Sequence, residues 1–191
     1  NCGKPLPEYE VEIKGPGGAV LPDKEIGRIF VRGASVMQGY FADPKSTKEV
    51  LSKDGWLDTG DMGYMLKDCI YIVGRVKDLI IINGKNQWPQ DIEWAVEQIA
   101  GVRSGDAAAI SIPGDAKEEV PLVLVQCRFS DDEDRRKLVE QAKKTVQQIA
   151  GVTCQIKLVA PRTLARTSSG KLSRAKCRAK FLSGELTGYP L

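Results

Sequence analysis

The sequence of 191 residues contains no histidine. Without an imidazole, the chain cannot supply a histidine general base, a Ser–His or Cys–His pair, or a histidine ligand for zinc. Its five cysteines are scattered and lack the C-x-x-C spacing of a thiolate metal site, so we expect reduced thiols in a cytoplasmic protein. These are Cys2, Cys69, Cys127, Cys154 and Cys177.

Long apolar runs are also missing. No stretch approaches the roughly 18 uninterrupted apolar residues that suggest a membrane-spanning helix, so we expect no integral membrane segment. The chain begins Asn1-Cys2-Gly3, without an initiator methionine or a signal-like apolar segment, and we expect it to be part of a longer protein. With 42% hydrophobic and 28% charged residues, it is long enough for one domain or two small ones.

Charge is nearly balanced overall, at +3, which does not indicate a nucleic-acid partner. Residues 1–77 carry eleven basic and eleven acidic groups, whereas residues 162–180 carry seven basic groups and no acid. Such a basic run is usually a solvated helix face. It could also attract an anionic ligand or partner.

The most unusual stretch is residues 55–93. It opens with a predicted loop, Asp58-Thr59-Gly60-Asp61, followed by a predicted hairpin with strands at 63–66 and 69–74. Pairing of these strands would bring Asp61 near Arg75. A carboxylate beside a guanidinium could bind the hydroxyls of a polyol or a nucleotide ribose. The alternative is an ordinary surface ion pair on a hairpin.

Apolar periodicity predicts an α+β fold with a β-rich first part. After the polar segment near residues 75–77, helices and strands alternate around a small sheet. The Asn83-Gly84 pair predicts a turn, and Pro89 is typical of the first turn of a helix. The predicted strands are 9–13, 27–31, 79–82, 107–112, 120–129 and 155–159, and we expect 107–112 and 120–129 to pair in antiparallel fashion. The predicted helices are 43–51, 89–99, 131–150 and 173–182. Ser173 is predicted to cap the last of these helices.

A second polar segment, Arg166-Thr167-Ser168-Ser169-Gly170-Lys171, predicts a flexible loop ending in one cation. It is not a phosphate-binding P-loop, because Ala165 stands where the first glycine is needed and Leu172 where the serine or threonine is needed. Considered by residue type alone, the segment is an ordinary exposed loop.

Three motifs together resemble those of the adenylate-forming superfamily, which contains acyl-CoA synthetases, non-ribosomal peptide adenylation domains and firefly luciferase. Residues 56–61 (WLDTGD) match its ribose-binding motif, residues 74–78 (GRVKD) match its hinge motif, and residues 166–171 (RTSSGK) match the loop of its catalytic lysine. The motifs occur in the family's order. Residues 77–93 are similar to the fatty acyl-AMP ligase branch.

This resemblance implies a division of the chain and a set of site residues. Residues 1–76 would be the β-rich end of a barrel-like N-terminal subdomain, and residues 77–191 a mobile C-terminal α+β domain with a three-stranded sheet and flanking helices. Lys77 would be the hinge. Asp61 and Arg75 would bind ATP or AMP, Lys171 would be the catalytic residue, and Gly84 would lie in the loop that meets the acceptor. No metal ligand is assigned.

The function that the resemblance implies is activation of a fatty acid with ATP and Mg²⁺, followed by transfer of the acyl group to the phosphopantetheine of an acyl carrier protein. One alternative is an acyl-CoA synthetase that uses free coenzyme A, and another is a non-catalytic interaction module. The Mg²⁺ ligand and the acyl pocket would precede this chain. We therefore expect the chain alone to be inactive.

Overall fold

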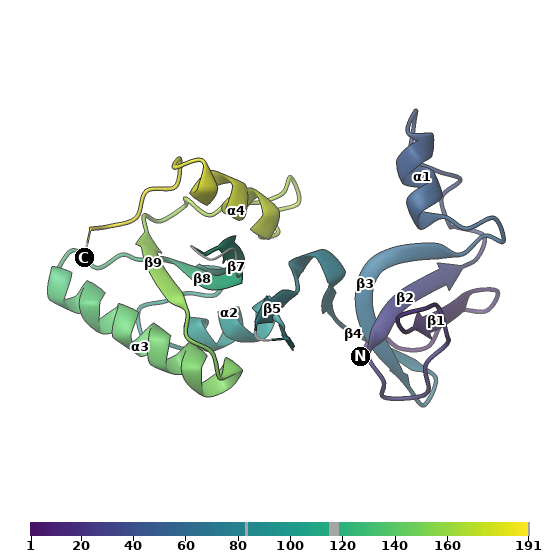
Figure 1. Cartoon of the computed structure of the whole chain (residues 1–191), viewed down its shortest axis with the longest axis horizontal. Helices are drawn as coiled ribbons and strands as arrows, with labels where there is room; N and C mark the ends of the chain where they lie inside the picture. The colour runs from purple at the N-terminus through teal and green to yellow at the C-terminus, as the bar shows by residue number, and fades with distance from the viewer. Residues whose placement is uncertain (83, 115–118, 191) are drawn as a thin grey trace. The chain divides into compact units, whose positions relative to one another are not determined.

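The chain divides into two compact units, residues 1–77 and residues 78–191, each described by itself below (Figure 1). The structure is a computed structural model that describes residues 1–82, 84–114 and 119–190. Together the units form an α+β chain, and the predicted fold class is confirmed.

The first unit is built on a four-stranded antiparallel sheet in the order β1-β2-β3-β4. Its strands are β1 (Glu10–Lys14), β2 (Gly27–Arg32), β3 (Leu57–Leu66) and β4 (Cys69–Arg75). The predicted loop at residues 58–61 is wrong, because these residues belong to β3. They pair with β2 on one side and β4 on the other, and this pairing outweighs the local turn preference of Gly60.

Two cations pack against one aromatic ring in this unit. Trp56 is buried, and the Lys14 ammonium and the Arg32 guanidinium lie 4.9 and 4.7 Å from its ring centroid. Such cation–π contacts let charged side chains cover an apolar surface without losing their hydration entirely. The short helix α1 (Pro44–Val50) lies where a helix was predicted, and it begins after Asp43, whose side chain accepts a hydrogen bond from the Ser46 backbone N–H.

The second unit is built on a three-stranded sheet in the order β7-β8-β9. β7 (Ala107–Pro113) and β8 (Glu119–Gln126) are antiparallel, as predicted, and β9 (Gln155–Val159) runs parallel to β8. β8 ends at Gln126, three residues before the predicted end. Alternate residues of β8 face opposite sides of the sheet, and both sides are buried.

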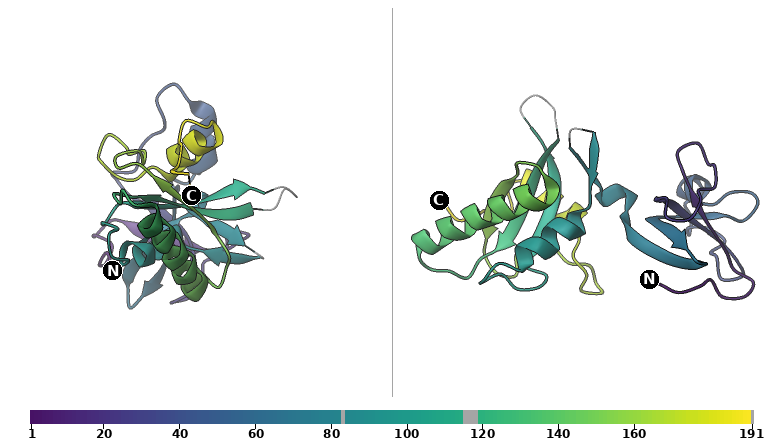
Figure 2. Two further views of the ribbon diagram at one scale, coloured as in Figure 1. Left: turned by 90° about the vertical axis from the view of Figure 1, so that its left-hand side faces the viewer. Right: turned by 90° about the horizontal axis from the view of Figure 1, so that it is seen from below.

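Helices cover both faces of this sheet (Figures 1 and 2). α2 (Pro89–Glu97) and α3 (Asp132–Ala150) pack on one face, where Val96, Ala142 and Val146 meet Val123 and Val125. α4 (Arg174–Leu182) packs on the other, where Cys177 meets Ile110 and Leu124. Burial of two apolar faces explains why a sheet of only three strands supports a compact unit.

The helix ends follow the sequence with two exceptions, the first being α2, which ends at Glu97, two residues before the predicted end. Asp131 caps α3 by accepting hydrogen bonds from two backbone N–H groups, and Gly151 ends α3 with φ +65°. Ser173 precedes α4 as predicted, but its side chain makes no capping hydrogen bond within the part of the chain that the structure describes. The capping role predicted for Ser173 is therefore wrong, although the helix begins where expected.

The outer edge of β9 is covered by the segment near the end of the described chain. The Tyr189 backbone N–H donates to the Leu158 carbonyl at 2.9 Å, and Val159 forms a bridge with Gly188. The Arg135 guanidinium of α3 lies 4.0 Å from the centroid of the Tyr189 ring. These contacts fix the tail segment against the sheet and α3.

Candidate functional site

The candidate ribose-binding pair of the first unit lies across the β3–β4 ladder. Asp61 pairs directly with Arg75, and the Arg75 Nε donates to Asp61 Oδ1 at 2.9 Å. The predicted closeness of these two residues is confirmed. The Asp61 side chain is 27% exposed and that of Arg75 is 68% exposed, so both can meet a ligand that approaches from solvent.

Thr59 and Gly60 set the direction of Asp61. The Thr59 hydroxyl donates to the Ile29 carbonyl of β2 at 2.8 Å and accepts from the Asp61 backbone N–H at 3.1 Å. Gly60 adopts φ +73°, a backbone conformation that residues other than glycine rarely adopt. The three consecutive residues therefore act together: the threonine attaches the strand to β2, the glycine turns the backbone, and the aspartate reaches Arg75.

Asp58 is the other carboxylate of the segment at residues 58–61. It forms an ion pair with Arg28 of β2, and its Oδ1 accepts from the Gly60 backbone N–H at 2.9 Å. Its side chain is 13% exposed. Asp58 therefore supports the backbone around Gly60, whereas the neighbouring Asp61 is the carboxylate that faces outward with Arg75.

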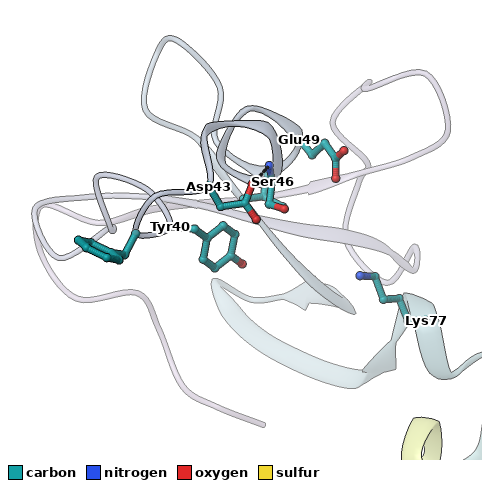
Figure 3. Close-up of a pocket in the computed structure, with 7 residues that line it drawn as sticks. Tyr40, Asp43, Ser46, Glu49 and Lys77 are labelled. Carbon is teal, nitrogen blue, oxygen red and sulfur yellow. Dashed lines mark hydrogen bonds between the residues drawn. The ribbon is translucent and has the colours of Figure 1, made fainter. Parts of the chain in front are cut away.

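The predicted hinge residue Lys77 lies in a single turn of 3-10 helix, Val76–Asp78, that follows β4. Its side chain is exposed and borders an open hollow of about 430 Å³ in the first unit (Figure 3). Neither Asp61 nor Arg75 is among the residues that line this hollow. The hollow is lined by Tyr40, Phe41, Asp43, Ser46, Glu49, Val50 and Lys77.

The predicted acceptor-side residue Gly84 lies in the second unit, between β5 (Ile80–Ile82) and β6 (Lys85–Gln87). Its φ is +73°, and a Cβ at this position would meet no atom within 4 Å. The backbone here is therefore exposed. Glycine is favoured at this position by the positive φ and not by a lack of space, because a Cβ there would meet no neighbouring atom. Asn83, the other half of the predicted turn, lies outside the described residues.

The lysine segment of the second unit is a hydrogen-bonded hairpin turn, closed by a bridge between Arg166 and Leu172. The Thr167 backbone N–H donates to the Lys171 carbonyl at 2.8 Å, and the Gly170 N–H donates to the Thr167 carbonyl at 2.9 Å. The Thr167 hydroxyl also accepts from the Lys171 N–H at 3.2 Å. Backbone bonds that no periodicity reveals thus order this turn, while the Lys171 side chain extends into solvent.

Arg166 holds the lysine hairpin to the rest of the second unit. Its guanidinium donates to the Gly170 carbonyl at 2.9 Å and to the Gly105 carbonyl at 2.8 Å. The turn that contains Gly105 is itself fixed by Asp106, which is buried and bound to Gln126 and Arg128. Burial alone would raise the pKa of Asp106, but the hydrogen bonds from Arg128 and Gln126 outweigh it and lower the pKa below its ordinary value.

The basic run at residues 162–180 is less available than its sequence suggests. Arg166 is bound to backbone carbonyls, and the Arg178 Nε donates to the Ser111 carbonyl at 2.7 Å. Arg174 is largely buried between the carboxylates of Asp78 and Glu93. Three of the seven cations therefore serve the fold of the second unit, and the run is not a uniform docking surface.

Arg174, Glu93 and Asp78 form an ion network that the sequence did not reveal. The Arg174 Nε and Nη2 donate to the two oxygens of Glu93 at 2.7 and 2.6 Å, and Nη1 donates to Asp78 at 2.7 Å. Burial raises the pKa of the Glu93 carboxyl, and the Arg174 guanidinium opposes this rise. The one feature of the sequence that could have pointed to this network is the position of Arg174, three residues after Lys171.

Neither a metal site nor a membrane span is found in the described ranges 1–82, 84–114 and 119–190. No group of three or more His, Cys, Asp or Glu side chains there could hold a metal ion. No helix in those ranges is both long and apolar enough to cross a bilayer.

Comparison with known proteins identifies the family of the chain. Residues 84–176 match the family model described as the AMP-binding enzyme C-terminal domain. The chain belongs to the adenylate-forming superfamily. It is 48% identical over 184 residues to a putative acyl-CoA synthetase of Caulobacter vibrioides, an alignment that covers 96% of this chain and 32% of that protein.

Two solved structures of the adenylate-forming superfamily extend the comparison. One, from work on fatty acyl-adenylate ligases of E. coli and L. pneumophila, has a TM-score of 0.85 and 41% identity and covers 97% of this chain and 32% of its own. The McyG A-PCP protein with phenylalanyl-adenylate has a TM-score of 0.85 and 30% identity, with coverages of 96% and 33%. The chain thus spans about a third of the length of these relatives. Other solved members hold ATP, which the family uses.

Proposed function

We propose that this chain is the C-terminal portion of an ATP-dependent fatty acyl-AMP ligase, with Lys171 as its catalytic residue. The observation that carries this proposal is the hairpin at residues 166–172. Its backbone is fixed by hydrogen bonds and by Arg166, while the Lys171 ammonium extends into solvent from it. A fixed base with a long cationic side chain suits a reaction between two anions, the fatty acid carboxylate and ATP.

The chemistry follows from charge. A carboxylate oxygen attacks the α-phosphorus of ATP, the bond from that phosphorus to the bridging oxygen breaks, and pyrophosphate leaves. The attack brings two negative groups together and increases charge on the phosphoryl oxygens. An ammonium can donate to both groups because it carries three donors on a flexible stem. Lys171 would bind the carboxylate and the phosphoryl oxygen together and would stabilise the charge that develops between them.

The first unit would bind the nucleotide. The Asp61 carboxylate would accept hydrogen bonds from the ribose hydroxyls, and the neighbouring Arg75 would hold the carboxylate in place and could donate to the same ligand. The direct Asp61–Arg75 pair and its exposure support this assignment. Mg²⁺ would be held by residues outside this chain.

We infer that residues from Lys77 onward form a mobile C-terminal domain that turns about this residue, after which the Gly84 region meets the acceptor. The exposed 3-10 turn at Lys77 and the open backbone at Gly84 support this inference. Two-state movement of this kind separates adenylation from acyl transfer. We place the reaction in the cytoplasm, consistent with five free thiols.

The test of Lys171 is ATP–pyrophosphate exchange by the full-length protein. Lys171→Ala should lower the exchange rate by about 10²–10³-fold, the usual cost of losing one preorganised contact to a transition state. Lys176→Ala, which removes an exposed lysine of α4, is the matched control and should exchange like the unmodified protein. Exchange that persists undiminished in Lys171→Ala would refute the proposal.

A second candidate function is an acyl-CoA synthetase, favoured by the similarity to the Caulobacter protein. The two functions differ in the acceptor of the acyl group. Acyl transfer should be measured with free coenzyme A and with a phosphopantetheinylated acyl carrier protein at equal concentrations. Preference for the carrier protein supports the acyl-AMP ligase, and preference for coenzyme A supports the synthetase.

A further inference from the structure

The buried network of Arg174, Glu93 and Asp78 connects three separate parts of the second unit. Arg174 is the first residue of α4, three residues after Lys171. Asp78 directly follows Lys77, and Glu93 lies in α2. One guanidinium therefore bonds the base of the lysine hairpin both to α2 and to the residue that follows the proposed hinge.

The geometry of this network is specific. Arg174 binds Glu93 through two parallel hydrogen bonds of 2.7 and 2.6 Å and uses its remaining nitrogen for Asp78 at 2.7 Å. Glu93 Oε1 also accepts from the Ala109 backbone N–H of β7 at 2.9 Å. The planar guanidinium thus fixes direction as well as distance, which a single ammonium could not do.

The network is also poorly explained by stability alone. The side chains of Arg174, Asp78 and Glu93 are 15%, 22% and 9% exposed, and they bring two carboxylates to one guanidinium. The loss of hydration by these three charged side chains offsets much of the Coulomb attraction between them, and apolar side chains of the same volume often stabilise a fold equally well. A geometric role accounts for the charged residues better than a contribution to folding does.

We propose that Arg174 is a positioning residue for Lys171, which it holds at a fixed place relative to Asp78 so that rotation at the hinge carries the ammonium to one defined point. The inference rests on the proposed function of Lys171. The hairpin at residues 166–172 carries its lysine only three residues from Arg174, and the Ser173 N–H to Ala165 carbonyl bond (2.9 Å) closes its base. Loss of the guanidinium would let this base shift, and a shift of about 1 Å at a reacting group can cost about 10²-fold in rate.

The first experiment uses Arg174→Lys in the full-length protein, because lysine keeps the positive charge but loses the three-way geometry. Its kcat for ATP–pyrophosphate exchange should fall by about 10²-fold, whereas its KM for ATP should stay within about twofold, since nucleotide binding is unaffected. The matched control is Arg178→Lys, one turn later on α4, whose arginine binds only the Ser111 carbonyl among the described residues. The control should change neither constant.

The second experiment asks whether Arg174 acts through Lys171. In the Lys171→Ala background, Arg174→Lys should cause no further loss of exchange, because residues that act as one unit are not additive. Asp78→Asn, which keeps the shape of the side chain, removes one arm of the network and should show the same pattern if Arg174→Lys fails to fold. Folding of each variant is checked by its thermal transition.

The outcomes separate the two proposals. If Lys171→Ala lowers exchange but Arg174→Lys and Asp78→Asn leave kcat unchanged, the positioning role is refuted and the function of Lys171 stands. If the single losses multiply in the double variant, Arg174 acts independently of Lys171 and the inference is also refuted. If Lys171→Ala itself exchanges normally, the proposed function is refuted and this inference with it.

Discussion

Replacement of Asp61 by alanine should separate ligand binding from folding. Asp61 contributes one oxygen to the Arg75 Nε at 2.9 Å, and the Arg75 side chain is 68% exposed. An ion pair with so exposed a partner contributes about 0–1 kcal/mol to folding, because water screens it. Asp61→Ala should therefore change the free energy of unfolding by no more than this amount.

The effect on nucleotide binding should be much larger. A hydrogen bond to a charged group is worth about 1.5–3 kcal/mol, and the proposed carboxylate–ribose contact contains up to two of them. Loss of about 3 kcal/mol corresponds to roughly a hundredfold weaker binding. The KM for ATP in pyrophosphate exchange by the full-length protein should rise by this factor, while kcat falls less because the Lys171 hairpin is unchanged.

The matched control is Asp68→Asn, which removes the charge and keeps a residue that tolerates the positive φ of 63° at this turn. Asp68 lies at the tip of the same β3–β4 hairpin and forms an ion pair with Lys4 at 3.0 Å, with both side chains more than half exposed. This variant should alter neither the KM for ATP nor the urea unfolding curve appreciably. If Asp61→Ala behaves like Asp68→Asn in both measurements, the pair with Arg75 is an ordinary surface ion pair and the ribose-binding assignment is refuted.

Two further predictions concern the second unit. The lowered pKa of Asp106 means that its contribution to stability is fully present above the unfolded pKa of about 3.9, declines below it, and is lost once pH has fallen through the folded pKa. Asp106→Asn should therefore cost about 1–3 kcal/mol at pH 7 and less at pH 3 in urea titrations, and an equal cost at both values would contradict this account. Burial raises the pKa of the Cys154 thiol to about 11. At pH 8, iodoacetamide should therefore modify exposed Cys2 and leave Cys154 of the folded protein unmodified. Mass spectrometry that finds both cysteines modified at similar rates would refute this prediction.

The Asp61–Arg75 pairing was predictable from the sequence because it depends on a short hairpin. The strands are joined by Lys67 and Asp68, whose positive φ values of 51° and 63° give the two-residue turn typical of hairpins. From that turn the register continues along the ladder, with one irregularity between Met62 and Gly63, until Asp61 faces Arg75. Contacts within a short hairpin can be predicted because the turn and the two strands are close together in the sequence.

The Arg174 network was not predictable for the opposite reason. Arg174 lies 81 residues from Glu93 and 96 residues from Asp78, and each of these residues by itself looks like an ordinary helix or loop charge. Similarly, the attachment of the lysine hairpin to the rest of the second unit depends on the Gly105 carbonyl, 61 residues from Arg166. Such contacts arise only when the whole sheet is assembled, so periodicity and turn preference do not reveal them.

The tail segment on β9 has a consequence for how the second unit behaves in solution. Tyr189 satisfies the Leu158 carbonyl, and Arg135 holds the Tyr189 ring in place. A chain shortened before Gly188 would present a bare strand edge, which readily recruits a strand from another molecule. Gly188 and Tyr189 therefore cover a strand edge that would otherwise be open to pairing with another molecule.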